Sequence, residues 1–185
     1  MDKVIFRGKA DPNGSYGLEL NKALEECAGK AVLVIEKGVY PTGPIDIPSH
    51  TRLVLEEGAE LSFIPDFSIY PPVETWWEGV PCWAMHPCFN IAHVEDVVVE
   101  GKQFLRPPLL QIFDSKSVII RGITVTESPF WTVHPLLSEN LLIEDVHVKN
   151  PYDSPNTDGI DIEMCSGVTV RNCRVDVGDD GIAVK

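Results

Sequence analysis

The chain has 185 residues, 44% of them hydrophobic, which suits one globular domain spanning residues 1–185 and excludes a disordered chain. Its formal net charge of −13 repels polyanions, so nucleic acid is not expected as a partner, and an anionic sugar would need a local cluster of Lys or Arg. The sequence has neither an apolar stretch of the roughly 18 residues that span a bilayer nor a leader-like N-terminus, which predicts a cytoplasmic protein away from membranes, or a secreted one whose leader was removed.

The first predicted element is an amphipathic helix over residues 17–28. Its sequence, GLELNKALEECA, places Leu18, Ala23, Leu24 and Cys27 near helical spacing, and Leu20 off that stripe. Repeat structures need covered ends, because an open end exposes core and strand edges. We expect this helix to cap the N-terminal end of a repeat structure.

An internal repeat follows the helix. Six segments share an aliphatic–any–aliphatic pattern and begin 21, 44, 21, 23 and 27 residues apart: Val32–Val34, Leu53–Leu55, Val97–Val99, Val118–Ile120, Leu141–Ile143 and Val168–Val170. The 44-residue interval is interpreted as two periods, with one coil hidden in the Pro/Trp-rich stretch between Pro65 and Pro87. A period in the low twenties leaves no room for a helix in each repeat and indicates a β-solenoid.

The last three copies support this interpretation, because each continues through a bend into a second short strand. The bends fall at Gly122, Asp145 and Asn172, which occupy equivalent places in the three copies. A leucine-rich repeat would need a different leucine spacing and an Asn ladder, and a β-sandwich would not repeat residue types at equivalent positions. The solenoid is therefore favoured over both.

Five cysteines are present, an odd number that disfavours a disulfide framework in a chain without a leader. Cys82, His86 and Cys88 could be metal ligands, but no second Cys/His pair follows at zinc spacing. Loop thiols are the favoured interpretation.

Two acidic motifs lie one period apart near the end of the chain. Asp158 stands in N-T-D-G-I-D and Asp180 in G-D-D-G-I, 22 residues later, with Asp179 beside it. Stacked strands are roughly 4.7–4.9 Å apart, so the three carboxylates should meet, and mutual repulsion should raise at least one pKa. A protonated acid beside an ionised base suits glycoside hydrolysis. The alternatives are Asp residues that cap tight turns and a calcium site.

These motifs resemble the polygalacturonases of glycoside hydrolase family 28. The resemblance rests on N-T-D-G at residues 156–159 and G-D-D at residues 178–180, and extends to G-V-Y-P-T-G-P-I at 38–45, L-E-E-G-A at 55–59, R-P-P-L-L at 106–110 and S-P-F-W-T-V-H-P at 128–135. It implies an all-β right-handed parallel β-helix that hydrolyses α-1,4-galacturonosyl bonds of pectin or oligogalacturonides with inversion and without a cofactor or metal.

The resemblance also assigns roles by motif. It makes Asp179 the general acid and Asp158 and Asp180 the pair that activates water. The substrate-binding candidates are Asn156, Trp131, His134 and Arg106. Core packing is the alternative for Trp131, a turn hydrogen bond for His134, and a structural anchor for Arg106.

The sequence departs from the family pattern in two places. Residues 101–105 run straight into Arg106, so we expect a coil to be shortened or deleted, which affects the register between Val99 and Leu109. The family's G-H-G histidine and R-I-K cations, which bind the sugar carboxylate, would follow Lys185, so we expect a C-terminally truncated β-helix with weak or no activity. Turnover by residues 1–185 near the rate of a full-length homologue would refute this.

Two other functions stay open at this stage. A non-catalytic β-helix could bind pectic sugars or self-associate through its open C-terminal coil. A calcium-dependent pectate lyase would share the fold type but act by β-elimination. The two acidic motifs favour the hydrolase.

Overall fold

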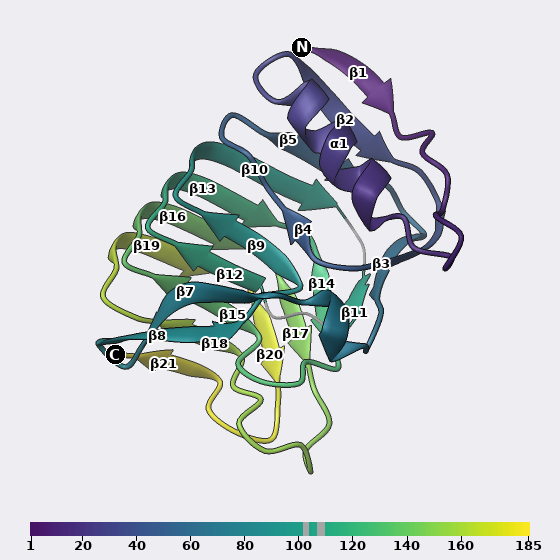
Figure 1. Cartoon of the computed structure of the whole chain (residues 1–185). Helices are drawn as coiled ribbons and strands as arrows, with labels where there is room; N and C mark the ends of the chain where they lie inside the picture. Colours follow the sequence, from purple (N-terminus) through teal and green to yellow (C-terminus); the bar gives the residue numbers. More distant parts are fainter. Residues whose placement is uncertain (102–103, 107–109) are drawn as a thin grey trace.

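The computed structural model describes residues 1–101, 104–106 and 110–185, and most of their regular structure is parallel β-strand. Three long sheets, here called A, B and C, run side by side along the molecule, and each turn of the chain adds one strand to each sheet in that order (Figure 1). Sheets B and C have six strands each. The predicted parallel β-helix is confirmed.

Each sheet stacks strands from successive coils. Sheet A comprises β1 (Asp2–Ile5), β2 (Ala31–Ile35), β5 (Arg52–Leu55), β10 (Glu95–Gly101), β13 (Lys116–Arg121), β16 (Glu139–Glu144) and β19 (Ser166–Arg171). Sheet B comprises β3 (Gly38–Thr42), β6 (Ala59–Phe63), β11 (Phe104–Arg106), β14 (Thr124–Thr126), β17 (His147–Lys149) and β20 (Arg174–Asp176). Sheet C comprises β4 (Ile45–Asp46), β9 (Phe89–Ala92), β12 (Leu110–Phe113), β15 (Val133–Leu136), β18 (Ile160–Ile162) and β21 (Ile182–Val184).

The aliphatic repeat of the sequence corresponds to the strand register of sheet A, because equivalent residues of successive repeats pair with one another. Val97 lies opposite Val118, Val118 opposite Leu141, and Leu141 opposite Val168. Alternation along each strand sends these side chains inward, and Val97 and Val118 are fully buried. Complete burial of an aliphatic side chain stabilises the fold by about 1.5–3 kcal/mol, so the stacked columns form the core.

The bends between sheets A and B also repeat as expected. Gly122, Asp145 and Asn172 have positive φ angles of 71°, 53° and 55°. Gly, Asn and Asp reach this left-handed region most readily, so these residue types mark the turn in each coil.

Helix α1 (Gly17–Cys27) covers the N-terminal end of the solenoid, where it packs against β2 and β4 (Figure 1). Its buried face differs from the expected stripe, because Leu20 is 1% exposed and Leu18 is 75% exposed. The buried residues Gly17, Leu20, Leu24 and Cys27 follow i, i+3, i+7 and i+10 spacing, so the true stripe passes through Leu20.

The prediction of a hidden coil between Pro65 and Pro87 is wrong. Strands β5 and β10 are neighbours in sheet A, with Leu53 opposite Val99, so one coil spans the whole 44-residue interval. The extra residues form a 3-10 turn (Phe67–Ile69) and an antiparallel hairpin of β7 (Pro72–Trp77) and β8 (Val80–Met85). Glu78 and Gly79 both have positive φ, which is the two-residue turn that closes hairpins and cannot join parallel strands.

The coil that was expected to be shortened contributes a strand to every sheet. Strand β11 pairs with β6 and β14, and β12 pairs with β9 and β15, so the register is continuous on both sides. Residues 102–103 and 107–109, which link these strands, lie outside the described residues. Within the described ranges, no helix is both long and apolar enough to cross a bilayer.

Candidate active site

Three carboxylates meet at the start of two neighbouring strands of sheet C. Asp158 precedes β18 and Asp180 precedes β21, and these strands pair in register, with the Gly159 amide donating to the Asp180 carbonyl at 2.9 Å. One carboxylate oxygen from each of Asp158, Asp179 and Asp180 lies within 4.8 Å of the other two. The predicted meeting of the aspartates is therefore confirmed as geometry.

Glycines let the two acidic turns approach so closely. A Cβ atom on Gly159 would stand 2.5 Å from the carbonyl oxygen of Gly181 on the next coil. A Cβ atom on Gly178 would collide with the backbone of Tyr152, in the loop before the N-T-D-G motif. The glycines of both motifs are thus explained by packing between coils.

A buried asparagine ties the Asp158 turn to the coil before it. Asn150 is 4% exposed, and its amide donates to the Thr132 hydroxyl at 2.7 Å and to the Thr157 carbonyl at 3.1 Å. Its side-chain oxygen accepts from the Ser128 amide at 3.0 Å. Asn150 therefore joins the residue before Asp158 to the preceding coil.

The electrostatics of the site favour a retained proton. Burial raises the pKa of Asp158, and the negative charges of Asp179 and Asp180 raise it further, while Lys185 opposes the rise. Asp161 is completely buried, and burial raises its pKa to about 6 although Lys185 lies 3.0 Å away. The predicted rise of at least one pKa is thus supported, and Asp161 is a fourth acidic residue of this region that the sequence analysis did not single out.

Trp131 and His134 are placed beneath the β7–β8 hairpin rather than on an open surface. The Trp131 ring stacks on Trp77 at 4.3 Å between centroids, and Lys185 lies over the Trp131 ring at 3.2 Å. His134 is 3% exposed and pairs with buried Glu163 at 3.2 Å. Burial lowers the pKa of His134, against the effect of Glu163. Neither side chain is free to touch a sugar while the hairpin stays in this position.

The other two substrate-binding candidates are placed differently. Asn156 is exposed in the turn before Asp158, with a positive φ of 53°. Arg106 ends β11, opposite Ser62, but its side chain lies outside the described residues. The roles of Asn156 and Arg106 stay predictions.

Among the described residues, Cys82, His86 and Cys88, for which a metal site was the less favoured interpretation, do not form a group with metal-binding proximity. His86 lies 3.2 Å from Asp46 and forms a hydrogen bond with the Pro87 carbonyl, and Cys88 is buried. In the described part of the chain, the three aspartates form the one group of His, Cys, Asp or Glu with metal-binding proximity. Clustered carboxylates suit hard cations as well as proton transfer, so geometry alone leaves both chemistries open.

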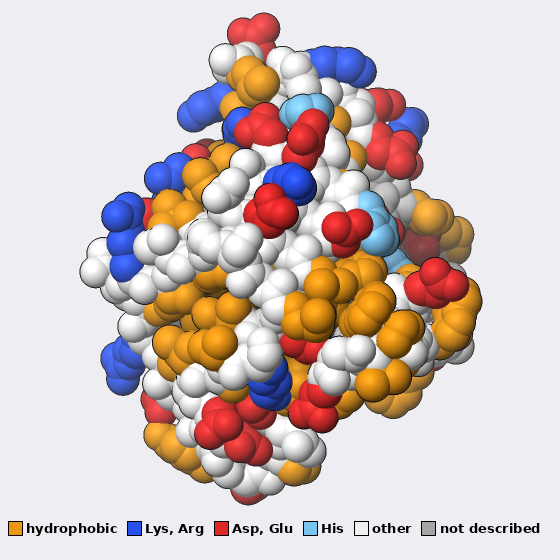
Figure 2. Space-filling view, turned by 90° about the vertical axis from the view of Figure 1, so that its left-hand side faces the viewer, with side chains coloured by type: hydrophobic (Ala, Val, Ile, Leu, Met, Phe, Trp, Pro, Cys, Tyr) orange, Lys and Arg blue, Asp and Glu red, His pale blue; other side chains and the backbone are white. Residues whose placement is uncertain are grey.

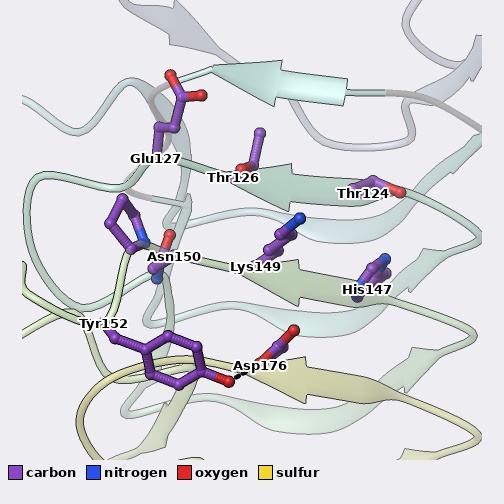
Figure 3. A pocket seen from close by; sticks show the side chains of 9 residues that line it. Thr124, Thr126, Glu127, His147, Lys149, Asn150, Tyr152 and Asp176 are labelled. Atoms are coloured by element: carbon purple, nitrogen blue, oxygen red, sulfur yellow. Dashed lines mark hydrogen bonds between the residues drawn. The ribbon is translucent and has the colours of Figure 1, made fainter.

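A separate hollow of about 500 Å³ lies on the outer face of sheet B (Figure 3). Side chains from β14, β17 and β20 line it, and Tyr152 points across its floor to donate a hydrogen bond to Asp176 (Figure 3). Its lining includes Lys149 and His147 but none of the three clustered aspartates. The hollow is thus distinct from the acidic site.

Comparison with known proteins places this site in a family. Residues 95–185 match the model of glycosyl hydrolases family 28, and this segment contains all three aspartates. A probable polygalacturonase of Vitis vinifera is 30% identical over 90% of this chain and 39% of its own length. An exopolygalacturonase of Zea mays is 27% identical over 95% of this chain and 47% of its own length.

Solved structures agree on the fold. An exopolygalacturonase from Thermotoga maritima superposes with a TM-score of 0.88 at 24% identity, covering 99% of this chain and 54% of that one. A polygalacturonase from Erwinia carotovora gives a TM-score of 0.80 at 17% identity, covering 100% of this chain and 57% of that one. The chain spans less than half the length of the two curated relatives described above. Residues 95–185 of the chain belong to glycosyl hydrolases family 28.

Proposed function

We propose that the site hydrolyses the α-1,4-galacturonosyl bonds of polygalacturonate or of oligogalacturonides. The observation that carries the proposal is the meeting of Asp158, Asp179 and Asp180 within 4.8 Å at the N-T-D-G and G-D-D motifs, in a member of a glycosidase family. Glycoside hydrolysis needs one carboxyl group to protonate the leaving oxygen and another to activate water. Three adjoining carboxyl groups supply both.

Asp179 is proposed as the general acid, with Asp158 and Asp180 holding the attacking water. The resemblance supports this division of roles. The raised pKa falls on Asp158, where burial and the neighbouring charges favour the protonated form. Coupled carboxyl groups share their protons, so a proton held within the group is available to whichever carboxyl faces the leaving oxygen.

We propose that cleavage inverts the anomeric carbon. This proposal rests on the resemblance to the family and not on the distance between the carboxyl groups. Inverting glycosidases usually separate their two carboxyl groups by about 6.5–9.5 Å to admit a water molecule. Here the nearest oxygens of the three aspartates lie within 4.8 Å. Proton NMR of the first product decides the matter, because inversion gives the β-anomer and retention the α-anomer.

A pectic substrate brings its own negative charge to an acidic protein. Lys185 is a cation of this region, since it pairs with Asp161 at 3.0 Å and lowers the pKa of Asp158. Its charge offsets part of the repulsion that a galacturonate carboxylate would meet. We propose that the sugar carboxylate nearest the cleaved bond lies on the Lys185 side of the aspartates.

The product of polygalacturonate cleavage tests the proposal. Hydrolysis releases one new reducing end for each bond broken and leaves no ultraviolet absorption, whereas β-elimination leaves an unsaturated sugar that absorbs in the ultraviolet. Reducing ends without absorption are expected. Absorption that rises with the reducing ends, or failure both to cleave and to bind oligogalacturonides, would refute the proposal.

A further inference from the structure

The β7–β8 hairpin lies across the outer face of sheet C (Figure 1). That outer face carries a row of polar side chains, one from each successive coil: Asp46, Asn90, Gln111 and His134. The hairpin crosses this row and ends at Gly79, whose amide donates to Glu163 just after β18. Its tip therefore reaches the coil that carries Asp158.

Three contacts fasten the hairpin to three successive coils. The Thr75 hydroxyl accepts from Gln111 on β12 at 3.1 Å. Trp77 stacks on Trp131, just before β15, at 4.3 Å. The Gly79 amide donates to Glu163 at 2.8 Å. A hairpin held at two points on β7 and one in its turn does not open as a hinge would, so it is a fixed part of the fold.

The last fastening is the most deeply buried. Glu163 is 1% exposed, and its second oxygen pairs with His134 at 3.2 Å. A buried carboxylate is costly unless it is paired and hydrogen-bonded, and the hairpin tip supplies part of that satisfaction. Lifting the tip would leave Glu163 short of a donor, so the pairing favours the closed arrangement.

The tip also stands next to the acidic site. Lys185 lies over Trp131, the ring on which Trp77 stacks, and pairs with Asp161 three residues after Asp158. A polysaccharide chain that occupied the aspartates and continued over sheet C toward the N-terminal coils would meet the hairpin at once. The hairpin therefore blocks a sugar chain from extending over sheet C from the aspartates toward the N-terminal coils.

The charge of the hairpin makes it a barrier and not an additional binding surface. Residues 72–85 include Glu74 and Glu78, both exposed, and no Lys or Arg. Hydrophobic side chains gather on this side of the molecule (Figure 2), and on the hairpin Trp77, Val80 and Trp83 are among those that remain exposed. An anionic sugar chain gains no ion pair from such a surface and meets two like charges.

We propose that the fastened hairpin closes sheet C on one side of the aspartates and thereby confines the enzyme to the ends of galacturonan chains. This inference rests on the proposed function and adds its mode of attack. Thr75, Trp77 and Glu163 act as specificity-determining residues through the hairpin, without touching the bond that is cleaved. The products are then short, and long chains are shortened from one end.

Loosening the hairpin tests this. The double variant Trp77→Ala, Glu163→Gln weakens two of the three fastenings, and Trp83→Ala removes a 68% exposed tryptophan from the other strand as a matched control. A second variant replaces residues 73–84 by a short Gly/Ser linker, in case the double variant keeps its hairpin in place. Hydrogen exchange of the hairpin amides shows which variants are loosened, and the proteins are compared by viscosity loss per bond cleaved and by product size.

The unchanged protein and Trp83→Ala should release mono- and digalacturonate with little loss of viscosity. A loosened or hairpin-less variant should show at least several-fold greater viscosity loss per bond and longer early products. Where turnover is slow, the affinity for oligogalacturonides of two to six units is measured in place of cleavage. Affinity should level off at short length in the unchanged protein and keep rising with length in the loosened variant.

Two kinds of failure are distinguishable. Early internal cleavage by the unchanged protein, affinity that rises through six units, or an unaltered pattern in a variant whose hairpin exchanges freely would overturn this inference alone. Absence of both cleavage and binding in every protein would refute the proposed function, and the mode of attack with it.

Discussion

Asn150→Ala should destabilise the protein by removing the link between the Asp158 turn and the preceding coil. The side chain is 4% exposed and makes three hydrogen bonds, to the Ser128 amide, the Thr132 hydroxyl and the Thr157 carbonyl. Each such bond contributes about 0.5–1.5 kcal/mol, so losing three costs about 3 kcal/mol. For a domain of this size, 1 kcal/mol shifts the melting temperature by about 2–4 °C, so a fall of about 6–12 °C is expected.

Thermal unfolding followed by circular dichroism measures this change. Asn13→Ala serves as the control, because Asn13 is exposed and surface substitutions usually stay within about 0.5 kcal/mol. A fall of less than about 2 °C for Asn150→Ala, or an equal fall in the control, would show that the network does not hold the turn. Weaker substrate binding at temperatures where Asn150→Ala is folded would indicate that Asp158 has moved.

Three further predictions concern the same region. Burial raises the folded-state pKa of Asp161 from its ordinary value of 3.8 to about 6, so the protein loses stability as pH rises from about 4 to about 6. Asp161→Asn should flatten this part of the stability profile in denaturant titrations at a series of pH values. An unchanged slope would contradict the raised pKa of Asp161. Gly178→Ala should lower both melting temperature and turnover because its Cβ meets the Tyr152 backbone, whereas Gly181→Ala, whose nearest neighbour is Val175 at 3.9 Å, should be tolerated; equal effects would argue against the packing explanation. Added EDTA should leave cleavage unchanged, and loss of activity that calcium restores would instead support a cation at the aspartates.

The sequence predicted those parts of the fold and site that repeat. Val97, Val118 and Leu141 are spaced by the length of one coil, so their separation already contained the register of sheet A. The same reasoning brought Asp158 and Asp180 together, since a 22-residue separation places residues at equivalent points of adjacent coils. Periodicity is informative in a solenoid because each coil packs only on its neighbours.

What does not repeat was not predictable in this way. The β7–β8 hairpin has the length of an additional coil, and length alone suggested one. The Gly79–Glu163 hydrogen bond joins residues 84 positions apart, and a contact between a loop amide and a single carboxylate leaves no periodic signal. Trp131 and His134 stood out by residue type, but only the position of the hairpin shows that both are buried.

Asp161 was visible in the N-T-D-G-I-D motif yet was not singled out. Its alternation with Ile160 and Ile162 indicates that it leaves the core, which is the usual situation of an exposed Asp. It is nevertheless 0% exposed, and Lys185 on the following coil pairs with it at 3.0 Å. Burial of an outward-facing residue depends on what covers it, and strand alternation carries no information about that.

The rate of reducing-end release from polygalacturonate by Asp179→Asn tests the central claim most directly, with oligogalacturonide binding measured on the same protein. Loss of a general acid commonly lowers the rate by about 10²–10⁴-fold, and such a loss is expected here with binding retained. Asp153→Asn, which removes an exposed carboxylate from the neighbouring loop, should match the unchanged protein. An Asp179→Asn rate within a few-fold of the unchanged protein would contradict a catalytic role for the three aspartates.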